Sequence, residues 1–288
     1  MGLLDILSSA SKHPRAAALY LGFFLGCAAI WKLIQFRNAA TYDHVLTLSA
    51  SLQSLAFALL VVEGGTNCGE GISEKSLWAF FIAHVTRLST TMWGPGYVPE
   101  DNTSDVYLYQ LLELVGVLLL GYYLLKLSAL RGMRDVGQGM ERWSLLSGMV
   151  GTSVVLAWMT KSTGHNDYFA DLSWMFSVWL EAFALGPQVL LLCSGVHTVD
   201  EGGMHFVALT CAASLAFGSF WSRSAYDQYA DFRKEGAHAF YWGILACAFI
   251  RVALCVVFLF MFLRTARGTK GGTSLHGSAD DVFADDMI

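Results

Sequence analysis

The most regular feature of the chain is a series of apolar runs separated by short polar segments. A bilayer is crossed by roughly 20 helical residues, so each run predicts one transmembrane helix. The third, fifth and seventh runs are short and polar, which predicts that they lie inside the bundle. No small-residue cleavage site follows the first run, which favours a retained span over a signal peptide. The eight predicted spans cover residues 16–36, 45–63, 76–93, 105–127, 143–160, 171–194, 203–221 and 239–264.

The sixth span carries two carboxylates in an otherwise apolar run. Asp171, Trp174, Glu181 and Gln188 fall at steps of three and four residues or their multiples, so a helix places them on one face. A carboxylate within the membrane is costly, which predicts that this face looks into protein or a water-filled cavity. Pro187 predicts a kink near the far end of the span.

Composition narrows the class of protein. The chain is 55% hydrophobic and only 14% charged, against about 25% charged in soluble domains, which indicates a polytopic, all-α membrane protein. No basic patch suited to nucleic acid is present. The six cysteines form no C-x-x-C pair, and no enzyme motif such as G-x-S-x-G or H-E-x-x-H occurs. We therefore expect neither metal nor cofactor, and no enzyme. The Gly/Ser-rich, then acidic tail has the composition of a disordered segment.

Orientation is predicted from the distribution of lysine and arginine. Ten of these residues lie on the side of the membrane that holds the N-terminus, and six lie on the opposite side. Positive residues accumulate on the cytosolic side of membrane proteins, so both termini are predicted to be cytosolic.

Further charges lie inside the predicted spans. Arg87 stays protonated and needs a counter-charge or a ligand anion, for which Glu181 and Glu113 are the protein candidates. We expect Glu113 and Arg251 to pair with each other or to line a second polar cavity. His84, one turn before Arg87, is a candidate sensor of an acidic lumen.

Two segments resemble the KDEL receptors, the ER lumen protein-retaining receptors that return escaped residents from the Golgi. One is W-x-F-S-x-x-L-E-x-x-x-x-x-P-Q at 174–188, and the other is G-I-S-x-K-S at 71–76 followed by T-R-L at 86–88. A weaker likeness covers roughly residues 45 to 265. The extra first span is similar to a longer, KDEL-receptor-related sub-group. The resemblance implies a location in the endoplasmic reticulum and Golgi, and a double three-helix bundle like that of PQ-loop and SWEET transporters. The expected domains are an N-terminal segment at 1–40, the seven-helix domain at 41–266 and the tail at 267–288.

The resemblance also implies roles for single residues. Arg87 matches an arginine that helps hold a peptide's C-terminal carboxylate, and Asp171 stands where the receptors carry an acid that meets the ligand's basic end. Glu181 matches a member of an internal hydrogen-bond switch. The expected ligand-binding residues are Arg87, Asp171, Trp174 and Trp221. The expected switch or internal-pairing residues are Glu181, His205, Glu113 and Arg251, of which the last two have no family counterpart.

The chain departs from the receptor pattern at several ligand positions. Val45 and Leu46 stand in the region of a carboxylate-binding arginine, and no arginine stands at the matching place about one turn after Trp221. Thr90 replaces an acid, and Ala213-Ser214 replaces a Tyr-Arg pair that is the usual partner of the switch glutamate. Each lost charge-assisted contact is worth about 1.5–3 kcal/mol. The sequence therefore predicts that KDEL-type peptides are not bound as the true receptors bind them.

Three functions remain open at this stage. The first is a receptor-like protein of the early secretory pathway, acting in retention and retrieval of luminal proteins or in a diverged sorting role. Its expected partners are the lipid bilayer, a luminal peptide or protein C-terminus, and vesicle coats. The second is a PQ-loop or SWEET-like transporter of a small solute. The third is a structural membrane subunit whose buried charges only pair with one another.

Overall fold

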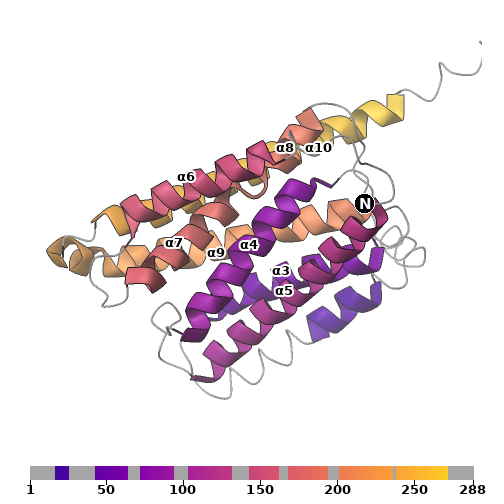
Figure 1. Cartoon of the computed structure of the whole chain (residues 1–288). Coiled ribbons are helices and arrows are strands. Elements are labelled where there is room, and N and C mark those ends of the chain that lie inside the picture. The colour runs from indigo at the N-terminus through magenta and orange to yellow at the C-terminus, as the bar shows by residue number, and fades with distance from the viewer. Residues whose placement is uncertain are drawn as a thin grey trace, which may run out of the picture.

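The computed structural model describes residues 17–25, 43–63, 72–93, 103–131, 143–161, 168–193, 201–235 and 238–271. Within these ranges the regular structure is helical throughout, with no strand. A short helix covers residues 17–25, at the indigo end of the chain in Figure 1. The others are α3 (Asp43–Glu63), α4 (Glu74–Trp93), α5 (Thr103–Arg131), α6 (Ser144–Thr160), α7 (Tyr168–Phe183), α8 (Gly186–Cys193), α9 (Glu201–Glu235) and α10 (His238–Gly271).

Each of the seven spans predicted from residue 45 onwards corresponds to a described helix, the sixth to α7 and α8 together, and the chain is an all-helical, polytopic membrane protein. Of the first predicted span, 16–36, only residues 17–25 are described. In the described ranges, five helical segments are long and apolar enough to cross a bilayer: Val45–Glu63, Tyr107–Ala129, Tyr168–Cys193, His205–Ser224 and Ala239–Met261. α6 is apolar but shorter. α4 is not among the five, because it carries His84, Arg87 and several hydroxyl residues along its length.

The helices form two units of three with the same pattern of contacts (Figure 1). In the first unit α3 and α4 both pack against α5, and in the second α7 with α8 and α9 both pack against α10. The first helix of each unit also packs against the second helix of the other, as α3 with α9 and α4 with α7. This is the double three-helix arrangement expected from the sequence. The α3–α9 and α4–α7 contacts are called the two seams below.

The carboxylate-bearing sixth span is the most buried of these five segments. Of its apolar window 67% is buried, against 33% in the windows of α5 and α10. The kink predicted at Pro187 is present as a turn at Ala184 and Leu185, after which α8 begins at Gly186. Pro187 is the second residue of α8, where a missing N–H breaks no helical hydrogen bond.

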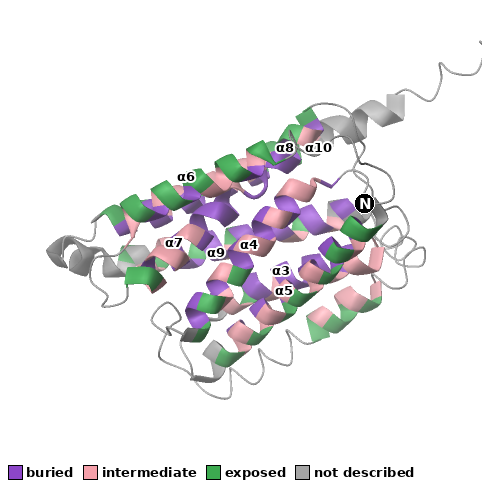
Figure 2. Ribbon diagram, viewed as in Figure 1, coloured by how far each residue is buried: buried purple, intermediate pink, exposed green. Residues whose placement is uncertain are grey.

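The prediction that the third, fifth and seventh spans lie inside holds for α4 and α9 but is wrong for α6. α6 lies at the edge of the molecule, where Figure 2 shows much of it exposed, and its buried residues are Leu146, Ser153 and Ala157. The polarity of α6 comes from small residues that need no tertiary partner. Ser147 Oγ, for example, donates to the carbonyl of Trp143 within its own chain segment at 2.9 Å.

The core contains two large apolar clusters with a polar layer between them, and a small third cluster of Leu55 and Leu59. One contains an aromatic group of Phe57, Phe80 and Phe206, and the other contains Trp174 and Phe217. Along each of α4, α5, α7, α9 and α10, polar or charged residues lie between or beside members of the clusters. These residues are His84, Arg87, Glu113, Glu181, Ser214 and Arg251.

The predicted end domains are described only in part. The N-terminal segment at 1–40 is represented by residues 17–25, and the remainder lies outside the described residues. α10 runs to Gly271, past the boundary predicted at 266, so the helix continues into the segment expected to be disordered. The rest of the tail, 272–288, lies outside the described residues.

Candidate functional site

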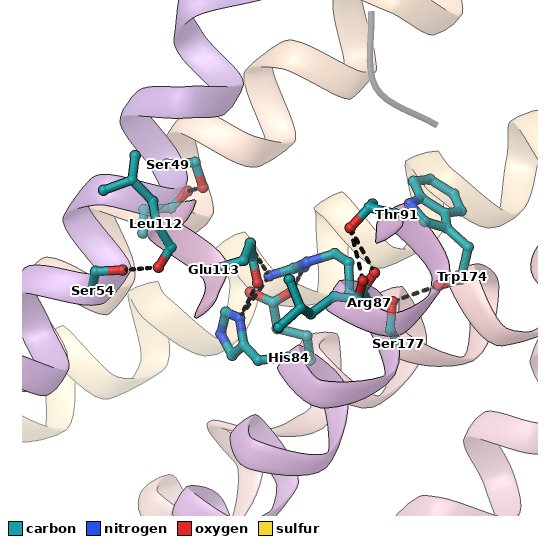
Figure 3. A network of polar contacts seen from close by, with 12 residues as sticks. Ser49, Ser54, His84, Arg87, Thr91, Leu112, Glu113, Trp174 and Ser177 are labelled. Carbon is teal, nitrogen blue, oxygen red and sulfur yellow. Dashed lines mark hydrogen bonds and ion pairs between the residues drawn. The ribbon is translucent and has the colours of Figure 1, made fainter. Parts of the chain in front are cut away.

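Arg87 is the centre of a buried network of charges. The side chain is on α4, 4% exposed, and its guanidinium meets carboxylates from two other helices. Nη2 donates to Glu113 Oε1 on α5 at 2.8 Å, and Nη1 donates to Glu181 Oε2 on α7. Figure 3 shows Arg87, Glu113 and His84 converging from α4 and α5. Both protein partners considered from the sequence are therefore engaged at once.

His84 completes this half of the network. Its Nδ1 lies 2.7 Å from Glu113 Oε2 and 3.0 Å from Arg87 Nη2. One carboxylate oxygen of Glu113 thus pairs with Arg87 and the other with His84, and these two residues are a turn apart on α4. The sequence marked His84 as a pH sensor on its own. The structure places it inside the charge network, which the three-residue spacing from Arg87 could have indicated.

The other half of the network is built on Glu181 and Arg251. Arg251 Nη2 on α10 donates to Glu181 Oε1 at 2.6 Å and lies 3.4 Å from Ser214 Oγ on α9. The expected pairing of Glu113 with Arg251 is wrong for the described contacts, because each meets a different partner. Glu113 is held by Arg87 and His84, while Arg251 is held by Glu181. Sequence position alone does not show which of four helices lie close enough to pair.

Phe217 lies beneath both guanidinium groups. Its ring centroid is 4.2 Å from Arg251 Cζ and 5.7 Å from Arg87 Cζ, within the range of cation–π attraction. No motif in the sequence points to Phe217. The available signal was its place three residues after Ser214, which puts both on one face of α9.

The network contains two arginines that face two glutamates, so these four charges balance. Isolated buried charges are costly, and a bilayer interior removes the water that would otherwise solvate them. Here every carboxylate oxygen of the two glutamates has a cationic or imidazole partner. The network joins α4 to α5 within one unit, α7 to α10 within the other, and α4 to α7 across a seam.

Asp171 and Trp174 lie on the same buried side of α7 as Glu181, but apart from the charge network. Asp171 is 1% exposed, and among the described residues neither of its carboxylate oxygens has a hydrogen-bond partner. Trp174 packs against Trp221 of α9, edge to face, with ring centroids 4.7 Å apart, and against Phe240 of α10 at 5.9 Å. The indole Nε1 of Trp221 is also buried, with no partner in the described ranges. The structure thus brings together three of the four residues expected to bind ligand, while the fourth, Arg87, belongs to the network.

His205 lies away from both groups. It is near the start of α9 and its Nδ1 is 2.8 Å from the hydroxyl of Tyr20, on helix 17–25. The internal partner of His205 is thus Tyr20, which lies outside the seven-helix domain.

In the described part of the chain no group of three or more His, Cys, Asp or Glu side chains is placed to hold a metal ion. Cys193, Cys211, Cys247 and Cys255 are free thiols.

The two segments on which the family resemblance rests meet in space. The backbone N–H of Ser73, just before α4, donates to Gln188 Oε1 of α8 at 2.7 Å. Gln188 is fully buried there. This contact links the start of α4 to the broken end of the sixth span, although 115 residues separate the two positions.

The model of the family described as ER lumen protein retaining receptor matches residues 68–224, more than half of the chain. The matched part contains both motif segments, the seam between α4 and α7, and Trp221. No curated protein matches the chain significantly.

Proposed function

Since the chain belongs to the ER lumen protein retaining receptor family, we propose that it is a receptor-like integral membrane protein of the endoplasmic reticulum and Golgi with a diverged ligand preference. Its luminal ligand is held through a positively charged group rather than through a C-terminal carboxylate. Family membership supports the receptor-like role, and the surroundings of Asp171 and of Arg87 support the ligand preference. The same membership indicates a receptor rather than an enzyme.

The observation that carries the proposal is the state of Asp171. Its carboxylate is buried without a hydrogen-bond partner in the described part of the chain, and Trp174, one turn along α7, packs against Trp221. A buried acceptor left without a partner costs about 1–3 kcal/mol or more when charged, and a cationic ligand group would remove that cost. Aromatic faces attract cations as well. An amine or guanidinium group of a luminal peptide fits this chemistry.

Arg87 supports the second half of the proposal. In the receptors the matching arginine helps bind a carboxylate, but here Glu113 and Glu181 already occupy its guanidinium. A ligand carboxylate would have to displace one of them, and that buried glutamate would lose its bond to Arg87. The other receptor arginines have no counterparts at Val45-Leu46 or one turn after Trp221. We therefore expect the terminal carboxylate of a ligand to add little to binding.

The test is a pair of tetrapeptides, Lys-Asp-Glu-Leu with a free and with an amidated C-terminus, titrated into the purified protein at acidic and neutral pH. We expect the two forms to bind alike and weakly, and Asp171→Asn to weaken both while Asp171→Glu retains them. Tight binding that requires the free carboxylate and is lost in Arg87→Ala would contradict the proposal and restore the ordinary receptor function. A basic peptide without the Asp-Glu-Leu ending serves as the comparison ligand.

One observation favours transport of a small solute as the second candidate. The sixth span is broken before Pro187 in a protein of two similar three-helix units, and broken helices between repeats are typical of transporters. Uptake of a labelled basic solute into proteoliposomes, abolished by Asp171→Asn, would favour this candidate. Peptide binding without uptake would favour the receptor.

A further inference from the structure

Helix 17–25, which precedes the seven-helix domain, packs against one of the two seams. Its residues Leu19, Tyr20 and Phe23 contact a cluster formed by Leu55 and Leu59 of α3, against which Leu209 of α9 also packs. The opposite face of the helix is exposed, with Leu21 at 62% and Phe24 at 65%. The helix therefore lies on the outside of the bundle with one face against the α3–α9 seam.

A polar contact accompanies this packing. The hydroxyl of Tyr20 lies 2.8 Å from His205 Nδ1, and the two rings meet edge to face with centroids 5.5 Å apart. Helix 17–25 thus contacts both helices of the seam, α3 through its leucines and α9 through His205.

α6 stands in the same relation to the other seam. It packs against α4 and α7, the two helices of that seam. Its Leu146 belongs to the cluster that contains Leu77 of α4, and its Met149 and Val150 pack against that cluster. Just before α6, Trp143 contacts Trp78 of α4 with ring centroids 6.3 Å apart.

The positions of these contacts repeat between the two units. Trp78 and His205 are each the fifth residue of their helix, counted from Glu74 in α4 and Glu201 in α9. His205 contacts Tyr20 of helix 17–25, and Trp78 contacts Trp143, the residue just before α6.

The repeat continues into the charge network. Arg87 and Ser214 are each the fourteenth residue of the same two helices. Arg87 contacts Glu113 on α5 and Ser214 contacts Arg251 on α10, so in each unit the second helix meets the third at this level. The correspondence therefore extends over about two and a half turns of helix.

We propose that the chain consists of two four-helix halves, 17–131 and 143–271, in which helix 17–25 is the counterpart of α6. The order along the chain agrees, because helix 17–25 precedes α3 as α6 precedes α7. In this architecture each half contributes one peripheral helix. Helix 17–25 packs across the α3–α9 seam, and α6 packs across the α4–α7 seam. The helix that precedes the receptor-like domain is then a structural part of the bundle and not an appended anchor.

The two clasps, which are the contacts of Tyr20 with His205 and of Trp143 with Trp78, lie at one end of the bundle. His205 is sixteen residues before Trp221 on α9, about 24 Å along a helix axis at 1.5 Å per residue. On α4 the contact at Trp78 is likewise near the end that meets Gln188, away from Asp171. Movement between the halves is therefore restricted at the clasped end and freer at the end that holds Asp171, Trp174 and Trp221. The functional meaning of that freedom rests on the function proposed above, whereas the clasp itself does not.

Cysteine cross-linking in membranes tests the placement in the full-length protein with the native cysteines replaced. With a short thiol-to-thiol cross-linker, the pair Tyr20→Cys and His205→Cys should react several-fold more than Leu21→Cys with His205→Cys, because Leu21 faces outward. Equal yields from the two pairs would overturn the proposal. This result is independent of any ligand, so it separates the clasp from the proposed function.

Spin-label distances test the action of the clasp. One pair of labels spans α3 and α9 near the clasp, and a second pair spans α4 and α7 near α6. Phe23→Ala should broaden the first distance distribution and leave the second unchanged, and Phe24→Ala on the exposed face should change neither. The milder variant Tyr20→Phe should give a smaller broadening in the first pair. No change in Phe23→Ala, or equal change at both seams, would overturn the proposal.

Discussion

Arg251 of α10 donates a hydrogen bond to Glu181 of α7 at 2.6 Å. The family resemblance implied a partner for Glu181 from the span that follows it, where this chain has Ala213 and Ser214. Here the cation comes from the next helix, and Ser214 contacts that cation at 3.4 Å instead of providing one. The positive charge opposite Glu181 is thus retained, but a different helix carries it. Any movement of Glu181 is consequently coupled to α10.

Replacing Arg251 by Met should destabilise the protein strongly. Removing one member of a buried ion pair leaves the other uncompensated and typically costs about 3–5 kcal/mol. Unfolding of the purified protein in detergent measures the loss, and Arg223→Ala, an exposed arginine on α9, is the control. Combining Arg251→Met with Glu181→Gln should cost less than the sum of the two single changes. Additive losses would show that the two residues are not coupled.

Gly243→Ala should separate α10 from α6. A Cβ at Gly243 would lie 2.6 Å from Thr160 Cβ and 2.9 Å from Thr160 Cγ2, closer than atoms in contact allow. Thr160 cannot move freely, because its Oγ1 accepts a hydrogen bond from Trp179 Nε1 at 2.9 Å. Overpacking of this kind costs about 1–3 kcal/mol.

The matched control for that change is Gly151→Ala on α6, where an added Cβ meets nothing within 4 Å. Since alanine favours helix over glycine by up to about 1 kcal/mol, this variant should be neutral or more stable. Thermal unfolding of the two proteins in the same detergent gives the comparison. A Gly243→Ala protein as stable as Gly151→Ala would disprove the close contact.

Gln188→Ala should destabilise the junction between α4 and α8. It removes the acceptor for the Ser73 N–H, and an unsatisfied buried donor costs about 1–3 kcal/mol. Ser73→Ala keeps that backbone N–H and loses only a long contact of its hydroxyl with the Ser76 N–H at 3.4 Å. We expect Gln188→Ala to lower the unfolding temperature more than Ser73→Ala does. A larger loss in Ser73→Ala would show that the junction depends on the Ser73 hydroxyl and not on Gln188.

Both termini should be cytosolic, as the ten-to-six distribution of lysine and arginine predicts. Protease treatment of sealed microsomes bearing a tag at either end is the measurement. Both tags should be digested without detergent. A protected N-terminal tag would place the first residues in the lumen and would remove the crossing predicted for residues 16–36.

The positions of the helices could be predicted from the sequence because helical spans depend on local properties. A run of apolar residues determines where a helix crosses the bilayer, and the spacing of Asp171, Trp174 and Glu181 determines that they share a face. The break before Pro187 is local as well, since it follows from a missing N–H and the bulk of the ring. The structure agrees with the sequence on each of these features.

The partners of the buried charges depend on distances between helices, which no local pattern contains. The sequence showed that Arg87 needed a counter-charge, but only packing brought Glu113 and Glu181 to it together and gave Arg251 to Glu181. The peripheral position of α6 was not predicted from the sequence, for a related reason. Its small polar residues suggested burial, yet hydroxyls that bond to the backbone of their own helix can face lipid at little cost. Tertiary structure likewise decided that His205 meets Tyr20, because the two residues are 185 positions apart and meet only when helix 17–25 packs on the seam.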